Sequence, residues 1–120
     1  MSQIPKYILN WRDKGGEIPV ATSLPESGVL LPNVLYELGV VDDDITVSFA
    51  EPVANIANVW CITFDIGATV PTITWTLPEQ TIWADGAAPT LEANTHYEIN
   101  LMDRLILVVS AAIPTITPEP

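Results

Sequence analysis

The hydrophobic and polar residues of this chain alternate with a period of two, which is typical of β-strands. In the stretch 70–91 three apolar residues alternate with threonines, namely Ile73, Trp75 and Leu77. Pro78 ends this alternation, because proline has no N–H group to donate to a strand ladder. The stretch then reaches Trp83 and an Asp85-Gly86 turn. We predict a strand followed by a corner that folds the sheet over.

Similar patterns recur at spacings of about ten residues and predict six or seven short strands. Besides 70–77, they cover residues 34–38, 45–49, 58–66, 95–101 and 104–110. In the third of these we expect the residues Trp60, Ile62, Phe64 and Ile66 to point inward, and Cys61, Thr63 and Asp65 outward. In 95–101 the inward set is Tyr97, Ile99 and Leu101, and the outward set is His96, Glu98 and Asn100. With no amphipathic helix in the sequence, we predict an all-β fold, a small antiparallel β-sandwich or jelly roll.

The last predicted strand is apolar on both faces. Leu105, Leu107 and Val109 point one way, and Ile106 and Val108 point the other. Such a strand is either central and covered on both sides, or it presents one face to another subunit.

The chain divides into three parts. Residues 1–28 contain scattered prolines and glycines and predict an extended N-terminal arm, residues 29–112 the β-domain, and residues 113–120 a proline-rich tail. The arm carries Tyr7, Ile8 and Trp11, which would be costly to leave in water. We therefore expect them to insert into their own domain or into a neighbouring subunit. We favour a partner, because aromatic anchors are enriched at interfaces.

Composition narrows the class. The 120 residues fit one domain, and 48% of them are hydrophobic, yet no run approaches the ~18 apolar residues of a membrane span. The first residues lack the pattern of a signal peptide, so we expect synthesis in a cytoplasm. Three cations and one anion give residues 1–14 a charge of +2, and the remainder carries −13. An acidic body argues against nucleic-acid binding, and nothing indicates a membrane partner.

Candidates for chemistry are sparse. A single cysteine, Cys61, excludes an internal disulfide, and with His96 as the only histidine neither a zinc site nor an activated nucleophile is indicated. No cofactor motif occurs, so we predict no enzyme activity and no cofactor. The consecutive Asp42, Asp43 and Asp44 predict a solvated turn rather than a calcium loop, because alternating acidic spacing is missing. Three further acids leave a glycosidase pair open in principle: Glu79, Asp85 and Glu92.

Tryptophans offer one alternative function. Trp60 and Trp75 fall at inward positions, whereas Trp83 lies beyond the proline and is freer to contact a ligand. A sugar ring can stack on such an indole, so a carbohydrate-binding module remains a second hypothesis. We favour packing of Trp83 at the corner of the sheet, given the area that an indole must bury.

Several fragments together resemble an all-β domain of bacteriophage virion proteins. They run from Leu31 to Val109 and comprise residues 31–39, 45–47, 60–64, 77–83 and 97–100. In the opening fragment the resemblance rests on Pro32-Asn33 followed by Tyr36, and in the fourth on Leu77-Pro78 separated from Trp83 by four residues.

Such domains occur in head-fibre, tail-fibre and appendage proteins, notably of phages of gut bacteria. The resemblance implies a virion structural protein, a head fibre or a capsid or tail decoration. It also implies a homotrimer that contacts a capsid or tail protein, here through the N-terminal arm, and possible binding of a host surface glycan. It supplies no catalytic residues.

Overall fold

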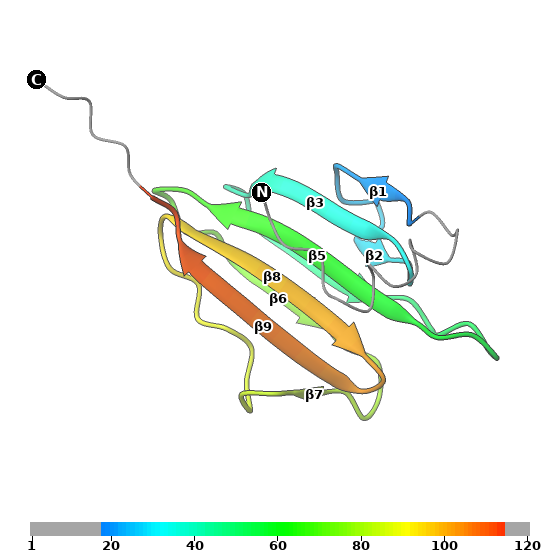
Figure 1. The fold of residues 1–120 in the computed structure, drawn as a ribbon. Helices are drawn as coiled ribbons and strands as arrows, with labels where there is room; N and C mark the ends of the chain where they lie inside the picture. The colour runs from blue at the N-terminus through cyan, green and yellow to red at the C-terminus, as the bar shows by residue number, and fades with distance from the viewer. Residues whose placement is uncertain (1–17, 115–120) are drawn as a thin grey trace, which may run out of the picture.

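The structure is a computed structural model that describes residues 18–114, and within them the chain is all-β (Figure 1). The described residues contain no helix, and so none that could cross a membrane. Nine strands in this part of the chain form two sheets. They are β1 (Val20–Ala21), β2 (Val29–Leu30), β3 (Leu35–Val40), β4 (Ile45–Phe49), β5 (Val59–Ile66), β6 (Ile73–Thr76), β7 (Ile82–Trp83), β8 (Thr95–Met102) and β9 (Leu105–Ala112).

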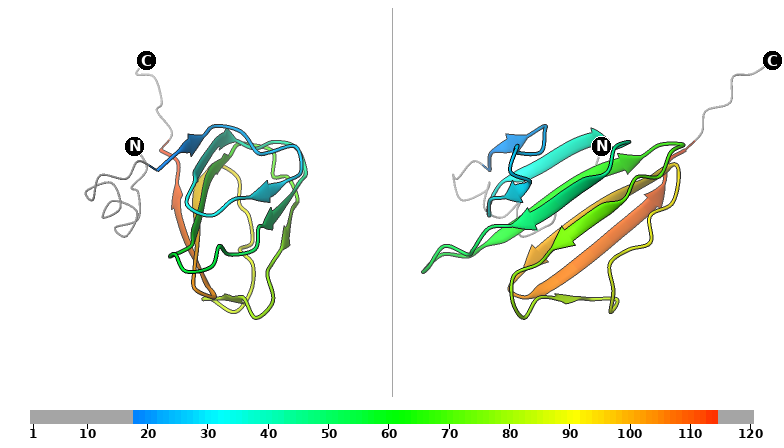
Figure 2. Two further views of the ribbon diagram at one scale, coloured as in Figure 1. Left: turned by 90° about the vertical axis from the view of Figure 1, so that its right-hand side faces the viewer. Right: turned by 180° about the vertical axis from the view of Figure 1, so that it is seen from behind.

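The chain passes back and forth between the two sheets (Figure 2). From β1 to β6 every odd strand joins a six-stranded sheet of order β1-β3-β5-β8-β9-β7, and every even strand joins a three-stranded sheet of order β2-β4-β6. Each strand therefore pairs with the one two places earlier, and these pairs are parallel. The path is a flattened coil in which each turn contributes one strand to each sheet.

The prediction of an antiparallel arrangement is wrong for most of the pairs. Besides the four pairs of the coil, β7 runs parallel to β9. Among the described strands only β5–β8 and β8–β9 are antiparallel. Period-two alternation reports which face a side chain occupies, and it is the same for both strand directions. The length and course of the connections determine whether two strands run parallel or antiparallel. Most are four residues or longer and cross between sheets, whereas β8 and β9 are joined through a tight turn at Asp103, whose φ is +60°.

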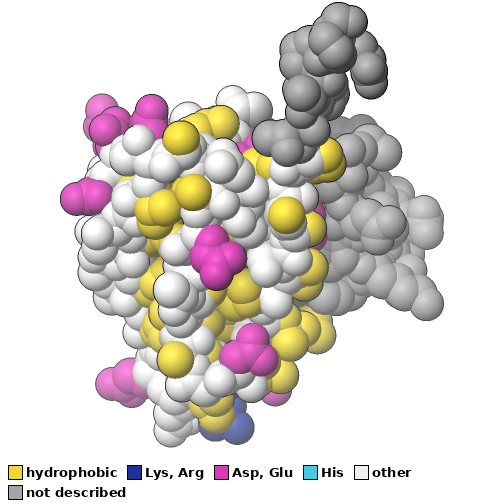
Figure 3. Space-filling view, turned by 90° about the vertical axis from the view of Figure 1, so that its left-hand side faces the viewer, with side chains coloured by type: hydrophobic (Ala, Val, Ile, Leu, Met, Phe, Trp, Pro, Cys, Tyr) yellow, Lys and Arg dark blue, Asp and Glu magenta, His cyan; other side chains and the backbone are white. Residues whose placement is uncertain are grey.

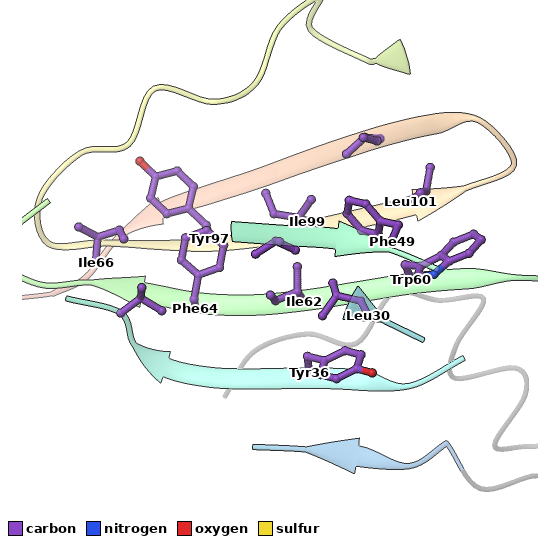
Figure 4. Packing of buried hydrophobic residues seen from close by; sticks show 13 residues of the cluster. Leu30, Tyr36, Phe49, Trp60, Ile62, Phe64, Ile66, Tyr97, Ile99 and Leu101 are labelled. Atoms are coloured by element: carbon purple, nitrogen blue, oxygen red, sulfur yellow. The ribbon is translucent and has the colours of Figure 1, made fainter. Parts of the chain in front are cut away.

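The core lies between the two sheets, and the residues of β5 and β8 that were predicted to point inward are part of it (Figure 4). The six-stranded sheet contributes Trp60, Ile62, Phe64, Ile66, Tyr97, Ile99 and Leu101, and the three-stranded sheet contributes Leu30, Val47 and Phe49. Aromatic rings join the layers: the ring of Phe49 lies edge-on to Trp60 at 6.4 Å between centroids and parallel to Trp75 at 6.5 Å. This interlocking of large rings fixes the spacing of the sheets.

Of the predicted arm, residues 18–28 are described, and they contact the folded domain. Strand β1 extends the six-stranded sheet, and the Leu35 N–H donates to the Pro19 carbonyl at 2.9 Å. Ala21 and Leu24 pack against the core, and Ile18 is buried on the opposite face of the sheet. Tyr7, Ile8 and Trp11 lie outside the described residues, as do residues 115–120 of the tail.

Candidate functional site

Polar side chains gather on the outer face of the six-stranded sheet, the face turned away from the three-stranded sheet. The antiparallel register of β5 and β8 puts Asp65 opposite His96 and Thr63 opposite Glu98. On the other side of β5, Glu37 of β3 is aligned with Thr63. Three strands distant in sequence thus bring three carboxylates and the imidazole to one area. We call these residues the polar cluster.

His96 is held between two carboxylates of the cluster. Its Nδ1 lies 2.5 Å from Asp65 Oδ1, and its Nε2 lies 3.3 Å from Glu98 Oε1. Ionised carboxylates only accept hydrogen bonds, so an imidazole that donates to both must carry a proton on each nitrogen. The geometry therefore suits the imidazolium ion. Neither ring nitrogen is left to take a proton from a nucleophile, which is the task of a general base.

The pKa of His96 follows this geometry. Partial burial lowers its pKa, but the hydrogen bonds that the imidazole donates to Asp65 and Glu98, together with their negative charges, outweigh burial and raise the pKa above 6.5. A raised folded-state pKa means that folding favours the protonated form. The resulting stability is fully present below the unfolded pKa of about 6.5 and is lost as pH rises through the folded pKa.

We expect the free energy of unfolding to fall as pH rises above ~6.5, by less than about 1 kcal/mol, because the pair is partly exposed. His96→Gln should remove this component of the slope, since glutamine does not titrate. Chemical denaturation of both proteins at a series of pH values measures it, and the comparison cancels groups common to both chains. Asp65→Asn is a second variant that should flatten the slope. Equal slopes in wild type and His96→Gln would show that the contact is not formed.

A cavity of about 570 Å³ opens beside the cluster. Its lining combines Glu37, Thr63, Asp65 and His96 with the end of β9 and Pro114. The lining is mixed: acidic Glu37 and Asp65 lie beside apolar Phe64 and the apolar end of β9, and no tryptophan within residues 18–114 is part of it. Within residues 18–114 no group of histidine, cysteine and acidic residues has a geometry suited to a metal ion.

Cys61 lies on the same outer face and is 1% exposed. Burial, with the nearby charges of Glu98 and Glu37, raises the pKa of its thiol to about 12. The thiolate is the nucleophilic form of cysteine, so this side chain is unreactive in the folded protein. It packs with Ile18, Leu35 and Val59 in a small second apolar cluster.

The other candidate residues lie elsewhere. Trp83 in β7 is half-buried, packs against the core, and lies edge-on to Trp75 at 5.7 Å between centroids. Asp42, Asp43 and Asp44 are exposed in the turn before β4, where the Asp44 carboxylate accepts a hydrogen bond from the Thr72 N–H at 2.8 Å. Asp44 therefore ties that turn to the start of β6.

The sequence predicted an outward position for His96 and did not predict its two partners, Asp65 and Glu98. The alternation correctly put Asp65, His96 and Glu98 on outward faces. What was missing was the pairing of β5 with β8 across the intervening strands β6 and β7. The sequence does contain a signal: an outward His-x-Glu in one strand and an outward Asp near the end of another. Knowledge of the register between those strands would have shown that the three side chains meet.

Compared with known protein families, with curated proteins and with solved structures, the chain matches none.

Proposed function

We propose that this protein is a structural subunit of a bacteriophage virion, a head fibre or a capsid or tail decoration, with a β-sandwich or jelly-roll type of domain. The phage assignment rests on the resemblance described above. Self-association, as a homotrimer in this proposal, rests on an exposed apolar stripe of the six-stranded sheet. A gene beside capsid, portal or tail genes would support the virion assignment.

The β9 stripe consists of Leu105, Leu107 and Val109, which are 45%, 47% and 55% exposed. Between them Ile106 is fully buried in the core, so the strand is covered on one face only. Met102, opposite Leu105 in β8, extends the patch and is 47% exposed. Contiguous exposed apolar side chains on a regular strand are typical of a protein–protein interface. Figure 3 shows one side of the molecule, where hydrophobic side chains are visible among scattered acidic ones.

From the sequence, either the last strand or the arm could supply the subunit contact. We assign this contact to the β9 stripe. Trp83 is not favoured as a sugar platform, because it lies edge-on to Trp75 and is half-buried. An acidic surface with a net charge of −11 keeps such subunits soluble while the stripe directs their contact.

Charge placed in the stripe should prevent self-association. We expect the wild-type chain to form trimers at micromolar concentration, and Val109→Glu to weaken association about tenfold or more, because a buried unpaired carboxylate costs over about 1.4 kcal/mol. Light scattering coupled to size-exclusion chromatography measures the mass. Val53→Glu is the matched control, since Val53 is 51% exposed in the loop before β5, away from the stripe. A monomeric wild type, or equal effects of both variants, would contradict the proposed interface.

A further inference from the structure

We propose that the open edge of β9 pairs, antiparallel, with the same edge of a second copy of this chain, so that the six-stranded sheets of two copies become continuous. By the β9 edge we mean the backbone of residues 107–112 on the side that faces away from β8. The inference goes beyond the proposed function, because the β9 stripe lies on the face of the strand, whereas this contact uses its backbone.

Strand β9 has a neighbour along its whole length on one side, but only at its start on the other side. All eight residues of β9 are paired with β8, whereas β7 is paired only with Leu105 and Ile106. Six residues, 107–112, therefore have no strand beyond them in the described part of the chain, and Figure 1 shows β9 at this margin of the sheet. After β7 the chain turns away, where the Gly86 N–H donates to the Trp83 carbonyl.

The hydrogen bonds at the two ends of β9 show which backbone groups point to the open edge. At one end the Ile113 N–H donates to the carbonyl of Asn94, just before β8, at 2.9 Å. At the other end the Ile106 carbonyl accepts the N–H of Ala84, just after β7, at 2.8 Å. Consecutive residues of a strand point their backbone groups to alternate sides. Odd-numbered residues of β9 therefore bond to β8, and even-numbered residues point outward. The outward set beyond β7 is Val108, Ser110 and Ala112.

The β9 edge lacks the features that protect exposed strands. Natural sheets blunt their edges with charged side chains, proline or a bulge, or they cover them. Residues 107–112 read Leu-Val-Val-Ser-Ala-Ala, and their pairing with β8 runs without a register shift. Val108 is half-buried, and the other five are exposed. Unpaired N–H and C=O groups at a regular spacing are what strand addition recognises. The partner that this edge fits is therefore an extended backbone.

A second copy of the same edge meets these requirements. In a two-fold antiparallel pair centred on Ser110, this residue lies opposite its own symmetry mate, and Val108 lies opposite Ala112 of the second copy. All three outward residues then form hydrogen-bonded pairs, each of which exchanges two N–H···O bonds. A strand shifted toward Leu105 would collide with β7, which fixes this register.

Charge also favours this occupant. The chain carries a net charge of −11, so that most surfaces of two copies repel each other. Residues 107–112 contain no acidic side chain, and the pair brings no carboxylate opposite another within the ladder. The two-fold contact is compatible with the three-fold contact proposed for the β9 stripe. Together they give a closed assembly of two trimers with dihedral symmetry.

Ser110→Cys tests the pairing directly. Hydrogen-bonded partners in an antiparallel ladder have Cα atoms about 5.5 Å apart, within the range of about 4.4–6.8 Å that a disulfide spans. We expect mild oxidation to cross-link S110C into dimers on a non-reducing denaturing gel. Ala112→Cys is the matched control and should stay monomeric, because the two copies of residue 112 lie about 14 Å apart in this register. Cys61 is 1% exposed and adds no reactive thiol.

Ser110→Pro tests whether backbone hydrogen bonds hold the pair. The Ser110 N–H points outward, so proline removes no bond within one copy and is tolerated at an edge. It removes both bonds at the centre of the pair, and we expect pairing to weaken about tenfold or more. Ser110→Ala keeps the N–H group and should pair like the wild type. Sedimentation equilibrium measures both variants, and circular dichroism shows whether each keeps its sheets.

Leu105→Glu separates the two contacts, because Leu105 belongs to the β9 stripe but lies outside residues 107–112. S110C should cross-link with or without this second substitution. Cross-linking in a chain that forms no trimers would contradict the stripe and support the edge. Trimers in which S110C does not cross-link would overturn the edge pairing and leave the stripe in place. Equal cross-linking of S110C and A112C, or equal association of S110P and S110A, would also overturn it.

Discussion

Replacing Phe64 with alanine should lower the free energy of unfolding by about 3–5 kcal/mol, one of the two largest effects that we expect in this domain. Phe64 lies in β5, is 1% exposed, and stacks on Tyr97 at 5.5 Å between ring centroids. It also contacts Trp75 of the opposite sheet at 6.4 Å. The substitution therefore removes contacts within one sheet and between the two sheets, and leaves a cavity that neighbouring strands cannot close.

Chemical denaturation followed by tryptophan fluorescence measures this loss. Thr74→Ala serves as the control, because Thr74 points to solvent from β6 and its replacement should change stability by less than about 0.5 kcal/mol. The total free energy of unfolding of a natural domain is about 5–15 kcal/mol, so the Phe64 variant should be close to unfolding at 37 °C. A loss below about 1 kcal/mol would mean that the two sheets are not packed through this ring.

Gly28→Ala should lower the free energy of unfolding by about 2–5 kcal/mol, although it adds a single methyl group. Gly28 has φ +72°, a conformation that favours glycine, and a Cβ there would lie 2.6 Å from the Thr46 carbonyl oxygen. That oxygen belongs to the backbone of β4, which is paired on both sides and cannot move away. Gly28 also accepts the Ser48 N–H and donates to Pro25, so a shift would break the entry into β2.

Gly39→Ala separates the two causes. Gly39 has a similar φ of +70°, but a Cβ there meets nothing within 4 Å. This variant should lose only the conformational cost of about 1–2 kcal/mol. Thermal and chemical unfolding of both variants give the difference, which reports the collision with β4. If the two substitutions cost the same, β2 does not approach β4 as closely as described.

Much of the fold could be predicted from the sequence, because burial imposes a visible pattern. The faces of Trp60, Phe64, Tyr97 and Leu101 followed from alternation. The strands of four or more residues began and ended within a few residues of their expected positions. Strand direction did not follow. It depends on where each connection leads, and the two-residue strands β1, β2 and β7 are too short to show a pattern of their own.

The candidate site shows the same limit. Asp65, His96 and Glu98 of the polar cluster were predicted to lie on outward faces, yet Asp65 and His96 are separated by 31 residues and meet only through register. Pairing is decided by the whole sheet, since one strand accepts a neighbour only where both hydrophobic faces match. The hydrophobic pattern of a single strand contains no information about its neighbours. The packing of the whole domain determines which strands pair.

The alternating path also bears on synthesis from the amino terminus. Strands β1 to β6 can pair in the order in which they emerge, because each of β3 to β6 pairs with the strand two places before it in the sequence. Strand β5, however, receives its second neighbour only when β8 is complete at Met102. Until then its backbone is an open edge beside Ile62 and Phe64, the situation in which nascent chains join one another. The C-terminal hairpin thus closes the sheet in the order of translation as well as in space.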